Sequence, residues 1–291
     1  MTMKIKRALV TGASGFIGRV LCSYLVQQGI KVTAISRKSK THAHNIVKEP
    51  IPAAWWKGID VVFHLAGVAH AGKEASITDE TYQKVNVETT QSLLDQAIEH
   101  HVPRFVFFSS VKAIEPVDRY GYSKLLAEER VLTAGQTGNI QVCVLRPALV
   151  YGPGLKGNLG AMQRAIKKGW LPTLPETGNR RSLISVQDLV RAAQMVAESP
   201  HTANQIYTVT DGIGYSTRNI YDVLCSMSGR KPSRFALPKW TFWLVSQLLL
   251  KPDLFEKLFG SAFFPDMSLA QDTGWEAEYS FWDVDRWNAG I

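Results

Sequence analysis

Residues 7–29 read RALVTGASGFIGRVLCSYLVQQG, and this stretch decides the fold. A short apolar run leads into a turn with three glycines, and apolar residues at helical spacing follow until Gly29. We expect Gly12 to make the tight turn, Gly15 to let the backbone approach a pyrophosphate, and Gly18 to allow close helix–strand packing. The phosphates of a dinucleotide would then lie at the positive N-terminus of the helix. The stretch therefore predicts a strand, a dinucleotide-binding turn and a helix.

The following residues continue this alternation of strand and helix. The segments KVTAIS, IDVVFHLAG, PRFVFFSS and IQVCVLRP read as strands, and helices are expected over 81–101 and 118–135. Such a run is typical of an α/β fold with a doubly wound parallel sheet, the Rossmann fold. After residue 150 glycine and proline become frequent, and the chain is expected to return to the sheet at ANQIYTVT. We predict a cofactor-binding domain from residues 1–150 and 182–211, and a smaller C-terminal substrate-binding domain from residues 151–181 and 212–291.

Composition indicates a folded protein and excludes several classes. The chain has 291 residues, and its 45% hydrophobic fraction suits a full core rather than a disordered chain. Cys22, Cys143 and Cys225 form no CxxC pair and no zinc spacing, so we expect buried thiols, no metal and a cytoplasmic location. The first residues lack the apolar core and cleavage site of a signal peptide.

The net charge of +8 points to an anionic ligand. The basic residues are scattered and no RNA-binding signature is present, so we expect a small anionic molecule and no nucleic acid. The apolar segment 240–250, WTFWLVSQLLL, is too short to span a bilayer. A buried helix is the preferred interpretation of this segment, and peripheral contact with a membrane surface is the alternative. Trp55 and Trp56 are expected to pack against the sheet.

The end of the second predicted strand bears on the choice of cofactor. An NAD site usually has an acid there, because a carboxylate accepts hydrogen bonds from the ribose hydroxyls. Here Ser36 occupies that position, and Arg37 and Lys38 follow it. A guanidinium binds a 2′-phosphate that a carboxylate would repel. The sequence therefore favours NADP(H), with NAD(H) as the alternative if Arg37 is only a solvated charge.

Two tyrosines precede one lysine in DRYGYSK, residues 118–124. Because a helix turns about 100° per residue, Tyr120 shares a face with Lys124 while Tyr122 points away. A nearby ammonium is expected to lower the pKa of Tyr120 from the ordinary value of about 10. Tyr120 could then exchange a proton with a carbinol or carbonyl oxygen while a hydride moves to or from a nicotinamide. An ordinary amphipathic helix is the alternative interpretation.

The strand FVFF ends in two serines, Ser109 and Ser110, just before this helix. Ligands bind at the carboxyl ends of the strands in sheets of this kind, so both serines are expected at the ligand-binding edge. Either hydroxyl could bond to the substrate oxygen. Together with the glycine turn and the Tyr/Lys pair, the serines predict a hydride-transfer site.

In order along the chain, TGASGFIG, HLAG, VNVETT, FSS, YGYSK and LRPALVYGPG resemble the landmarks of an extended short-chain dehydrogenase/reductase of the nucleotide-sugar epimerase/dehydratase family. The resemblance covers nearly the whole chain. It implies an NAD(P) cofactor, Tyr120 as acid/base, Lys124 as its partner and ribose ligand, and Ser110 rather than Ser109 as the third catalytic residue. Asn86 matches an asparagine that is mainly structural. The implied cofactor contacts are Gly12, Ser14, Gly15, Phe16, Ile17, Ser36, Arg37, Leu65, Ala66, Gly67, Tyr120, Lys124 and Pro147.

The same resemblance implies a substrate site, with Ser110 near the reacting oxygen. Asn158 and Leu159 resemble the family's contact with the nucleotide diphosphate, and Arg181 aligns with an arginine that grips the phosphates. A guanidinium suits that task because its fork meets phosphate oxygens bidentately; outside the family context Arg181 could be a solvated charge. Asp188 is expected to be a helix cap rather than a ligand.

More narrowly, FFSSVKAI, GYSKLLAEE, RPALVYGPGLKGN and NRRSLISVQDLV resemble bacterial UDP-sugar 4-epimerases and 4-keto reductases of polysaccharide and O-antigen synthesis. Those enzymes often act on UDP-N-acetylhexosamine derivatives. This chain departs from their pattern in its short connection from Lys112 to Tyr120. It also has no clear counterpart, between Val47 and Trp55, of the Asp that contacts adenine.

Three functions are therefore compared. The preferred one is a 4-keto reductase that transfers hydride from NADPH to C4 of a UDP-linked, sometimes N-acetylated, hexose. A UDP-sugar 4-epimerase with tightly bound NAD is the first alternative. A non-catalytic NADP(H)-sensing or scaffold protein on the same fold is the second. The resemblance also implies a homodimer, in which the helices near 86–100 and 118–135 pair.

Overall fold

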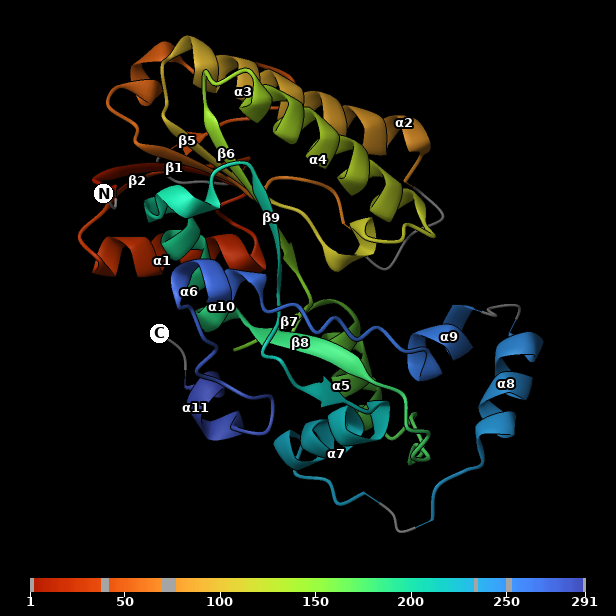
Figure 1. Ribbon diagram of the computed structural model, residues 1–291. Helices are drawn as coiled ribbons and strands as arrows, with labels where there is room; N and C mark the ends of the chain where they lie inside the picture. The colour runs from red at the N-terminus through yellow and green to blue at the C-terminus, as the bar shows by residue number, and fades with distance from the viewer. Residues whose placement is uncertain (1–2, 38–41, 70–76, 233–234, 250–252, 290–291) are drawn as a thin grey trace.

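A parallel sheet forms the centre of the computed structural model (Figure 1), which describes residues 3–37, 42–69, 77–232, 235–249 and 253–289. The strand order is β3-β2-β1-β4-β5-β6-β9, and every neighbouring pair is parallel. The order reverses direction beside β1, where such sheets bind ligands at the carboxyl ends of their strands. The predicted fold class is confirmed, including the return of the chain to the sheet at β9. The strands are β1 (Arg7–Thr11), β2 (Lys31–Ser36), β3 (His42–Ala43), β4 (Val61–His64), β5 (Arg104–Phe108), β6 (Gln141–Pro147) and β9 (Gln205–Val209).

Helices cover both faces of this sheet (Figure 1). Successive strand residues point to opposite faces, so Val10 packs in the core beneath α1 (Phe16–Gln27) and α6 (Val186–Glu198). Leu9 packs in the other core, beneath α3 (Thr89–Glu99) and α4 (Arg119–Gln136). Both faces are therefore apolar, which explains the uninterrupted apolar runs in the strand sequences. Short helical turns are η1 (Ala53–Trp56), η4 (Val111–Ala113) and η5 (Pro200–Thr202), and α10 (Ser268–Thr273) also lies near the sheet.

A smaller sheet of order β10-β8-β7 anchors the remaining elements. Its strands surround a third core that includes Tyr151, Leu183 and Tyr215. The predicted domain boundary at residue 182 falls inside β8, which pairs with β7 and β10 rather than with the central sheet. The interleaved division stays a prediction, with α6 and β9 on the central sheet. The elements here are β7 (Leu149–Tyr151), β8 (Arg181–Ser185), β10 (Gly214–Tyr215), α5 (Gly157–Lys168), α7 (Thr217–Met227), α8 (Lys239–Leu248), α9 (Asp253–Phe259) and α11 (Val284–Asn288).

Two helices differ from the expectations. The continuous helix predicted over 81–101 is instead α2 (Asp79–Tyr82), a π-helical segment η3 (Gln83–Glu88) and α3. Within α8, Trp240 is 64% exposed and Leu248 75% exposed, so the predicted burial of this apolar helix is wrong. No helix among the described residues is long and apolar enough to cross a membrane.

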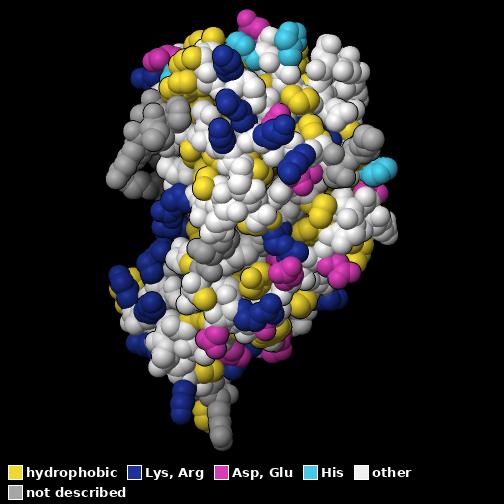
Figure 2. Space-filling model, turned by 90° about the vertical axis from the view of Figure 1, so that its left-hand side faces the viewer, with side chains coloured by type: hydrophobic (Ala, Val, Ile, Leu, Met, Phe, Trp, Pro, Cys, Tyr) yellow, Lys and Arg dark blue, Asp and Glu magenta, His cyan; other side chains and the backbone are white. Residues whose placement is uncertain are grey.

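The charged side chains of the surface are mixed on the face that Figure 2 shows. Lys and Arg side chains are spread over that face, and Asp and Glu side chains lie among them. A nucleic-acid site would gather basic side chains into one stripe or patch. This face therefore offers no such footprint.

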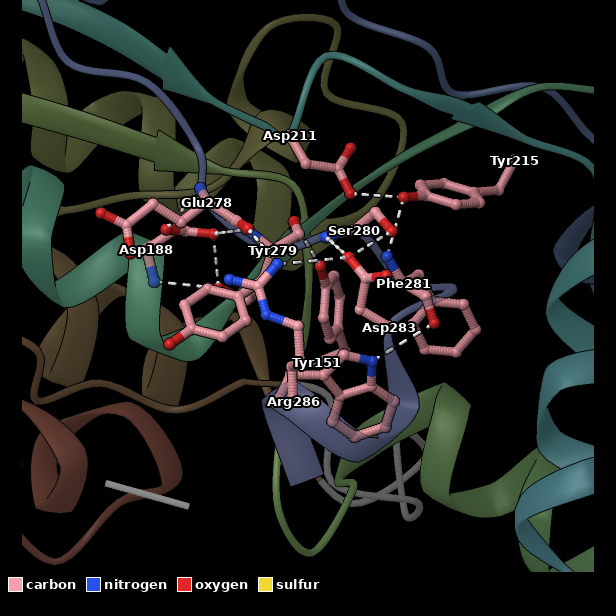
Figure 3. Close-up of polar contacts among 12 residues, drawn as sticks. Tyr151, Asp188, Asp211, Tyr215, Glu278, Tyr279, Ser280, Phe281, Asp283 and Arg286 are labelled. Atoms are coloured by element: carbon pink, nitrogen blue, oxygen red, sulfur yellow. Dashed lines mark hydrogen bonds and ion pairs between the residues drawn. The ribbon is translucent and has the colours of Figure 1, made fainter. Parts of the chain in front are cut away.

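Asp188 ties the C-terminal segment to the first turn of α6 (Figure 3). Ser185, not Asp188, is the N-cap: its hydroxyl accepts a hydrogen bond from the Asp188 amide at 2.9 Å. The fully buried Asp188 carboxylate instead accepts hydrogen bonds from the backbone N–H groups of Glu278, at 3.0 Å, and Tyr279, at 3.1 Å. Arg191 also donates to this carboxylate, at 2.8 Å. Asp188 is therefore an anchor, which corrects its predicted role as a cap.

Candidate functional site

The glycine turn brings β1, α1 and the end of β4 into close contact. Gly12 has a φ of +70°, and a Cβ there would lie 2.8 Å from the backbone nitrogen of Ala66. A Cβ on Gly18 would lie 2.3 Å from the carbonyl oxygen of Gly12. Both positions therefore need glycine for steric reasons, and Gly12 also needs it for its left-handed backbone.

The N-terminus of α1 has the properties of an anion site. Gly15 is its N-cap and supplies no side-chain hydrogen bond, and the first turn contains no acidic residue. No acidic side chain of this first turn therefore offsets the partial positive charge of the helix end, which suits a pyrophosphate.

A cavity of about 210 Å³ opens between this turn and the ends of β4, β5 and β6. Most of the cofactor contacts expected from the sequence line it together. Ser14, Ser36, Arg37 and Ala66 do not line it, although Ala66 lies against Gly12. The expected residues that line the cavity are Gly12, Gly15, Phe16, Ile17, Leu65, Gly67, Tyr120, Lys124 and Pro147.

The floor beside this cavity is held by a buried polar network. His64, at the end of β4, is fully buried, with Nδ1 2.7 Å from the Thr11 hydroxyl and Nε2 3.0 Å from the Thr90 hydroxyl. Burial lowers the pKa of His64 to about 3, with a smaller contribution from Lys124. The neutral imidazole therefore links β1 to α3.

Asn86 connects the segment after β4 to α4 through hydrogen bonds. Its side chain accepts a hydrogen bond from the Val68 amide at 2.9 Å and donates to the Val68 carbonyl at 3.1 Å. It also donates to the Ser123 hydroxyl at 2.8 Å, and Ser123 in turn donates to the Tyr120 carbonyl at 2.8 Å. This geometry is that of a positioning residue, which agrees with the structural role implied for Asn86.

Tyr120 lies in the first turn of α4, which Asp118 caps. The Asp118 carboxylate accepts a hydrogen bond from the Gly121 amide at 2.8 Å. It also forms an ion pair with Lys112 at 2.6 Å. These contacts fold the short connection between η4 and α4 tightly. Tyr120 is half-buried and its phenol forms a side-chain hydrogen bond with Ser110, whereas Tyr122 is 56% exposed.

The two serines at the end of β5 therefore differ in position. Ser110 bonds Tyr120 and also lines a second cavity, whereas Ser109 lies in the first cavity. The Ser109 hydroxyl is buried without a hydrogen-bond partner among the described residues. The two serines thus differ in position, and the choice of Ser110 as the third catalytic residue stays a prediction.

Lys124 lies under the first cavity, on the face of α4 that Tyr120 shares. Its Nζ donates to the Phe108 carbonyl at 2.6 Å and lies 4.2 Å from the centre of the Phe107 ring. Only 6% of the residue is exposed. Burial lowers its pKa to about 7, while the nearby Glu128 carboxylate acts in the opposite direction.

The pKa of Tyr120 differs from the expectation. Burial raises it to about 12, the hydrogen bond with Ser110 acts to lower it, and the Asp118 and Tyr82 side chains raise it further. The predicted lowering by the Lys124 ammonium is wrong for this structure, because desolvation of the phenolate dominates. In this state Tyr120 is a neutral phenol that can donate a proton.

A second cavity of about 230 Å³ begins at Ser110 and extends between α5, β8 and α7. It brings together Ser110, Asn158, Leu159 and Arg181, which are the substrate contacts expected from the sequence. We call this cavity the polar cleft. Residues from three segments that are far apart along the chain thus converge beside Ser110.

Arg181 in the polar cleft is held by backbone carbonyls. Its guanidinium donates to the carbonyls of Glu256, at 3.2 Å, and Lys257, at 3.0 Å, at the end of α9, and to the Thr217 hydroxyl at 3.3 Å. Burial lowers its pKa, and the Glu256 carboxylate acts against that shift. The guanidinium is therefore fixed in place at the cleft wall.

The carboxyl end of β2 carries the residues expected to select the cofactor. Ser36 is buried, and its hydroxyl has no hydrogen-bond partner among the described residues. Arg37 is exposed beside it. Lys38, the third member of the expected set, lies outside the described residues.

Several residues of the site could not be expected from sequence patterns. Lys257, Ala262 and Phe264 line the polar cleft but come from the segment after α8, which carries no motif. Lys112 lines it from the short connection before α4. His64 had a signal in the HLAG stretch, since a histidine that ends an apolar strand is unusual.

The chain is similar to several known proteins. Residues 8–210 match the family model described as the NAD dependent epimerase/dehydratase family. A UDP-glucose 4-epimerase of Vibrio cholerae is 31% identical over 93% of this chain and 90% of its own length. Among solved structures, MoeE5 in complex with UDP-glucuronic acid and NAD has a TM-score of 0.72, with 23% identity and 95% of each chain covered. RMD from Pseudomonas aeruginosa complexed with NADPH has a TM-score of 0.70, with 23% identity over 97% of this chain and 98% of that one. This chain therefore belongs to the NAD dependent epimerase/dehydratase family and is an NAD(P)-dependent enzyme of the extended short-chain dehydrogenase/reductase type.

Proposed function

We propose that this enzyme transfers a hydride at C4 of a UDP-linked hexose, and that it acts as a 4-keto reductase in the synthesis of polysaccharide or O-antigen sugars. The observation that carries the proposal is the position of Tyr120. It bonds Ser110 at the junction of two cavities, one with a dinucleotide-type helix N-terminus and one with the fixed Arg181 guanidinium. The UDP-sugars of the similar proteins support a nucleotide-linked sugar for the polar cleft.

Each residue of the proposed site has a defined role in this reaction. The nicotinamide supplies or accepts the hydride when the cofactor is bound. Ser110 donates a hydrogen bond to the substrate carbonyl oxygen, and the neutral Tyr120 phenol donates the proton that this oxygen needs after hydride addition. Asn158 and Arg181 bind the diphosphate, and Lys124 binds the ribose. The raised pKa of Tyr120 keeps the phenol protonated at neutral pH, as the proton-donating step requires.

A UDP-sugar 4-epimerase is equally supported, because the V. cholerae relative carries that name. The two activities differ in cofactor use. We expect the purified enzyme to consume NADPH with UDP-4-keto sugars and to leave UDP-glucose unchanged when no cofactor is added. Conversion of UDP-glucose to UDP-galactose without added cofactor, by protein that retains bound NAD, would instead establish the epimerase. A protein that binds NADP(H) and is inactive with every UDP- and dTDP-sugar would be the non-catalytic alternative.

We further propose that NADP(H) is the preferred cofactor. Arg37 is exposed at the end of β2, and Ser36 replaces the acid that would repel a 2′-phosphate. Changing Arg37 to alanine is expected to raise the KM for NADPH by about tenfold, because it removes a charge-assisted bond, while the KM for NADH changes little. Steady-state kinetics with both cofactors measure this effect. Equal changes for NADPH and NADH would argue against 2′-phosphate recognition, and Arg130→Ala, on an exposed face of α4, is the matched control.

Two properties of the assembly and location stay proposals. We propose a cytoplasmic homodimer that pairs through α3 and α4, which lie side by side (Figure 1). Tyr122 and Leu126 are 56% and 44% exposed on α4, so this helix offers apolar side chains for such a contact.

A further inference from the structure

A third, larger cavity lies beside the polar cleft and is almost entirely apolar. Its volume is about 590 Å³, and it lies between α5, α8 and α9. Asn158, Met162 and Lys257 line both this cavity and the polar cleft, so the two spaces adjoin. The remaining side chains are those of Ala161, Ala165, Trp170, Leu171, Pro172, Leu237, Thr241, Phe242, Val245, Leu249, Leu254 and Leu258. We call this space the apolar cavity.

The chemistry of this lining selects a hydrocarbon. Lys257, Asn158 and Thr241 are the polar side chains of the lining, and the others present carbon or an indole ring. A nucleotide base or a sugar placed there would lose its hydrogen bonds to water and find few replacements. An alkyl chain would instead gain about 0.8 kcal/mol for each buried CH₂ group.

Helix α8 is apolar on two faces, one toward the apolar cavity and one toward solvent. Thr241, Phe242, Val245 and Leu249 form the first face and line the cavity. The opposite stripe carries Trp240, Trp243, Leu244 and Leu248, whose exposures are 64%, 51%, 44% and 75%. Figure 1 shows α8 and α9 together at one end of the molecule, away from the central sheet.

Several basic side chains lie beside this apolar surface. Lys168 lies over the Trp170 ring at 4.3 Å, and Arg230 donates to the Lys167 carbonyl at 3.0 Å, next to the same tryptophan. Lys239, at the start of α8, lies 5.4 Å from the Phe255 ring. Residues 223–252 contain five lysines and arginines and no aspartate or glutamate. Apolar and tryptophan side chains within a basic segment are typical of a helix that lies on an anionic membrane surface.

We propose that the apolar cavity binds one alkyl chain of an anionic phospholipid, and that α8 thereby docks the enzyme on a membrane surface. The exposed indole rings of α8 suit the headgroup region, which attracts tryptophan because the ring has an apolar body and a polar N–H. A second copy of this chain fits the surface less well, because a twofold contact would bring the two basic segments together. The inference is independent of the proposed reaction, since the docking residues do not include Ser110, Tyr120 or Lys124.

Vesicle co-sedimentation tests this docking. We expect the full-length protein to bind vesicles of phosphatidylglycerol and phosphatidylcholine, to bind phosphatidylcholine alone much more weakly, and to dissociate as salt is added. Leu248→Asp, on the exposed stripe, and Ala165→Trp, which fills the cavity, should each weaken binding by about tenfold or more. Val26→Asp, a matched change at an exposed apolar position of α1, should bind like the wild type.

Three outcomes would overturn the proposal. If the wild-type protein did not bind anionic vesicles, docking on a membrane surface would be excluded. If Ala165→Trp bound vesicles like the wild type, the cavity would be excluded as the binding site of the alkyl chain. A protomer–protomer association that Leu248→Asp abolishes, seen by light scattering without lipid, would assign the surface to a second copy. Thermal unfolding of each variant separates these results from loss of the fold.

Discussion

Replacing Tyr120 with phenylalanine is expected to lower kcat by about 10²–10⁴-fold, the range of a general acid. The phenol oxygen is the atom that bonds Ser110 between the two cavities, and phenylalanine keeps the ring while removing that oxygen. Binding of cofactor and UDP-sugar should persist within a few-fold, because the cavities keep their shape. Single-turnover hydride transfer, followed by nicotinamide absorbance, measures the loss, and fluorescence titration measures the binding.

Tyr122→Phe is the matched control for this prediction. Tyr122 lies two residues further along α4, and it is 56% exposed on another face. The substitution makes the same chemical change outside the site, so activity should stay near that of the wild type. If Tyr120→Phe kept full activity, or if both variants lost it equally, the assignment of the proton donor would be refuted.

The glycine turn and the Tyr120/Lys124 pair could be predicted because both depend on residues that are close together in the sequence. Gly18 is required by its contact with Gly12 in the same turn, Gly12 is required by its left-handed backbone, and an apolar strand and an apolar helix frame them. The i, i+4 spacing that distinguished Tyr120 from Tyr122 is equally local, and the structure puts Tyr120 in the cavity and leaves Tyr122 exposed. Short-range geometry of this kind follows from the chain alone.

The parts that sequence reasoning missed depend on contacts over long sequence distances. Lys257 reaches the polar cleft from α9, and Arg181 is fixed by carbonyls 75 and 76 residues away. The pKa of Tyr120 was expected to fall because proximity to Lys124 is visible in the sequence, whereas burial is not. Likewise, α8 has the composition of a core helix, and only its placement at one end of the molecule leaves Trp240 and Leu248 exposed.

Replacing Lys124 with methionine is expected to lower activity by about 10²-fold or more and to remove the contribution of this lysine to the pH dependence of stability. The activity falls because the proposed ribose ligand and partner of Tyr120 is lost. The effect on stability follows from the pKa of Lys124, which burial lowers to about 7 in the folded protein, while the unfolded chain keeps the ordinary value of about 10.4. Between these two values the unfolded state binds more protons at this lysine, so the contribution of Lys124 to the free energy of unfolding rises with pH.

From pH 7.5 to 9 this increase amounts to about 2 kcal/mol for a single lysine, as the folded protein loses the cost of a buried ammonium. Asp211, whose pKa burial raises to about 7, has completed most of its titration before this window. Burial raises the pKa values of the Cys22, Cys143 and Cys225 thiols, so these groups lower the free energy of unfolding over the same window in every variant. Urea unfolding at both pH values should therefore give a change that is about 2 kcal/mol more positive in the wild type and in Lys112→Met, a partly exposed lysine of the same region, than in Lys124→Met. A change of the same size in Lys124→Met would mean that other groups produce it, and that Lys124 keeps its proton in the folded protein at pH 9. The same buried ammonium thus weakens the fold near neutral pH at the position where the proposed chemistry needs a positive charge.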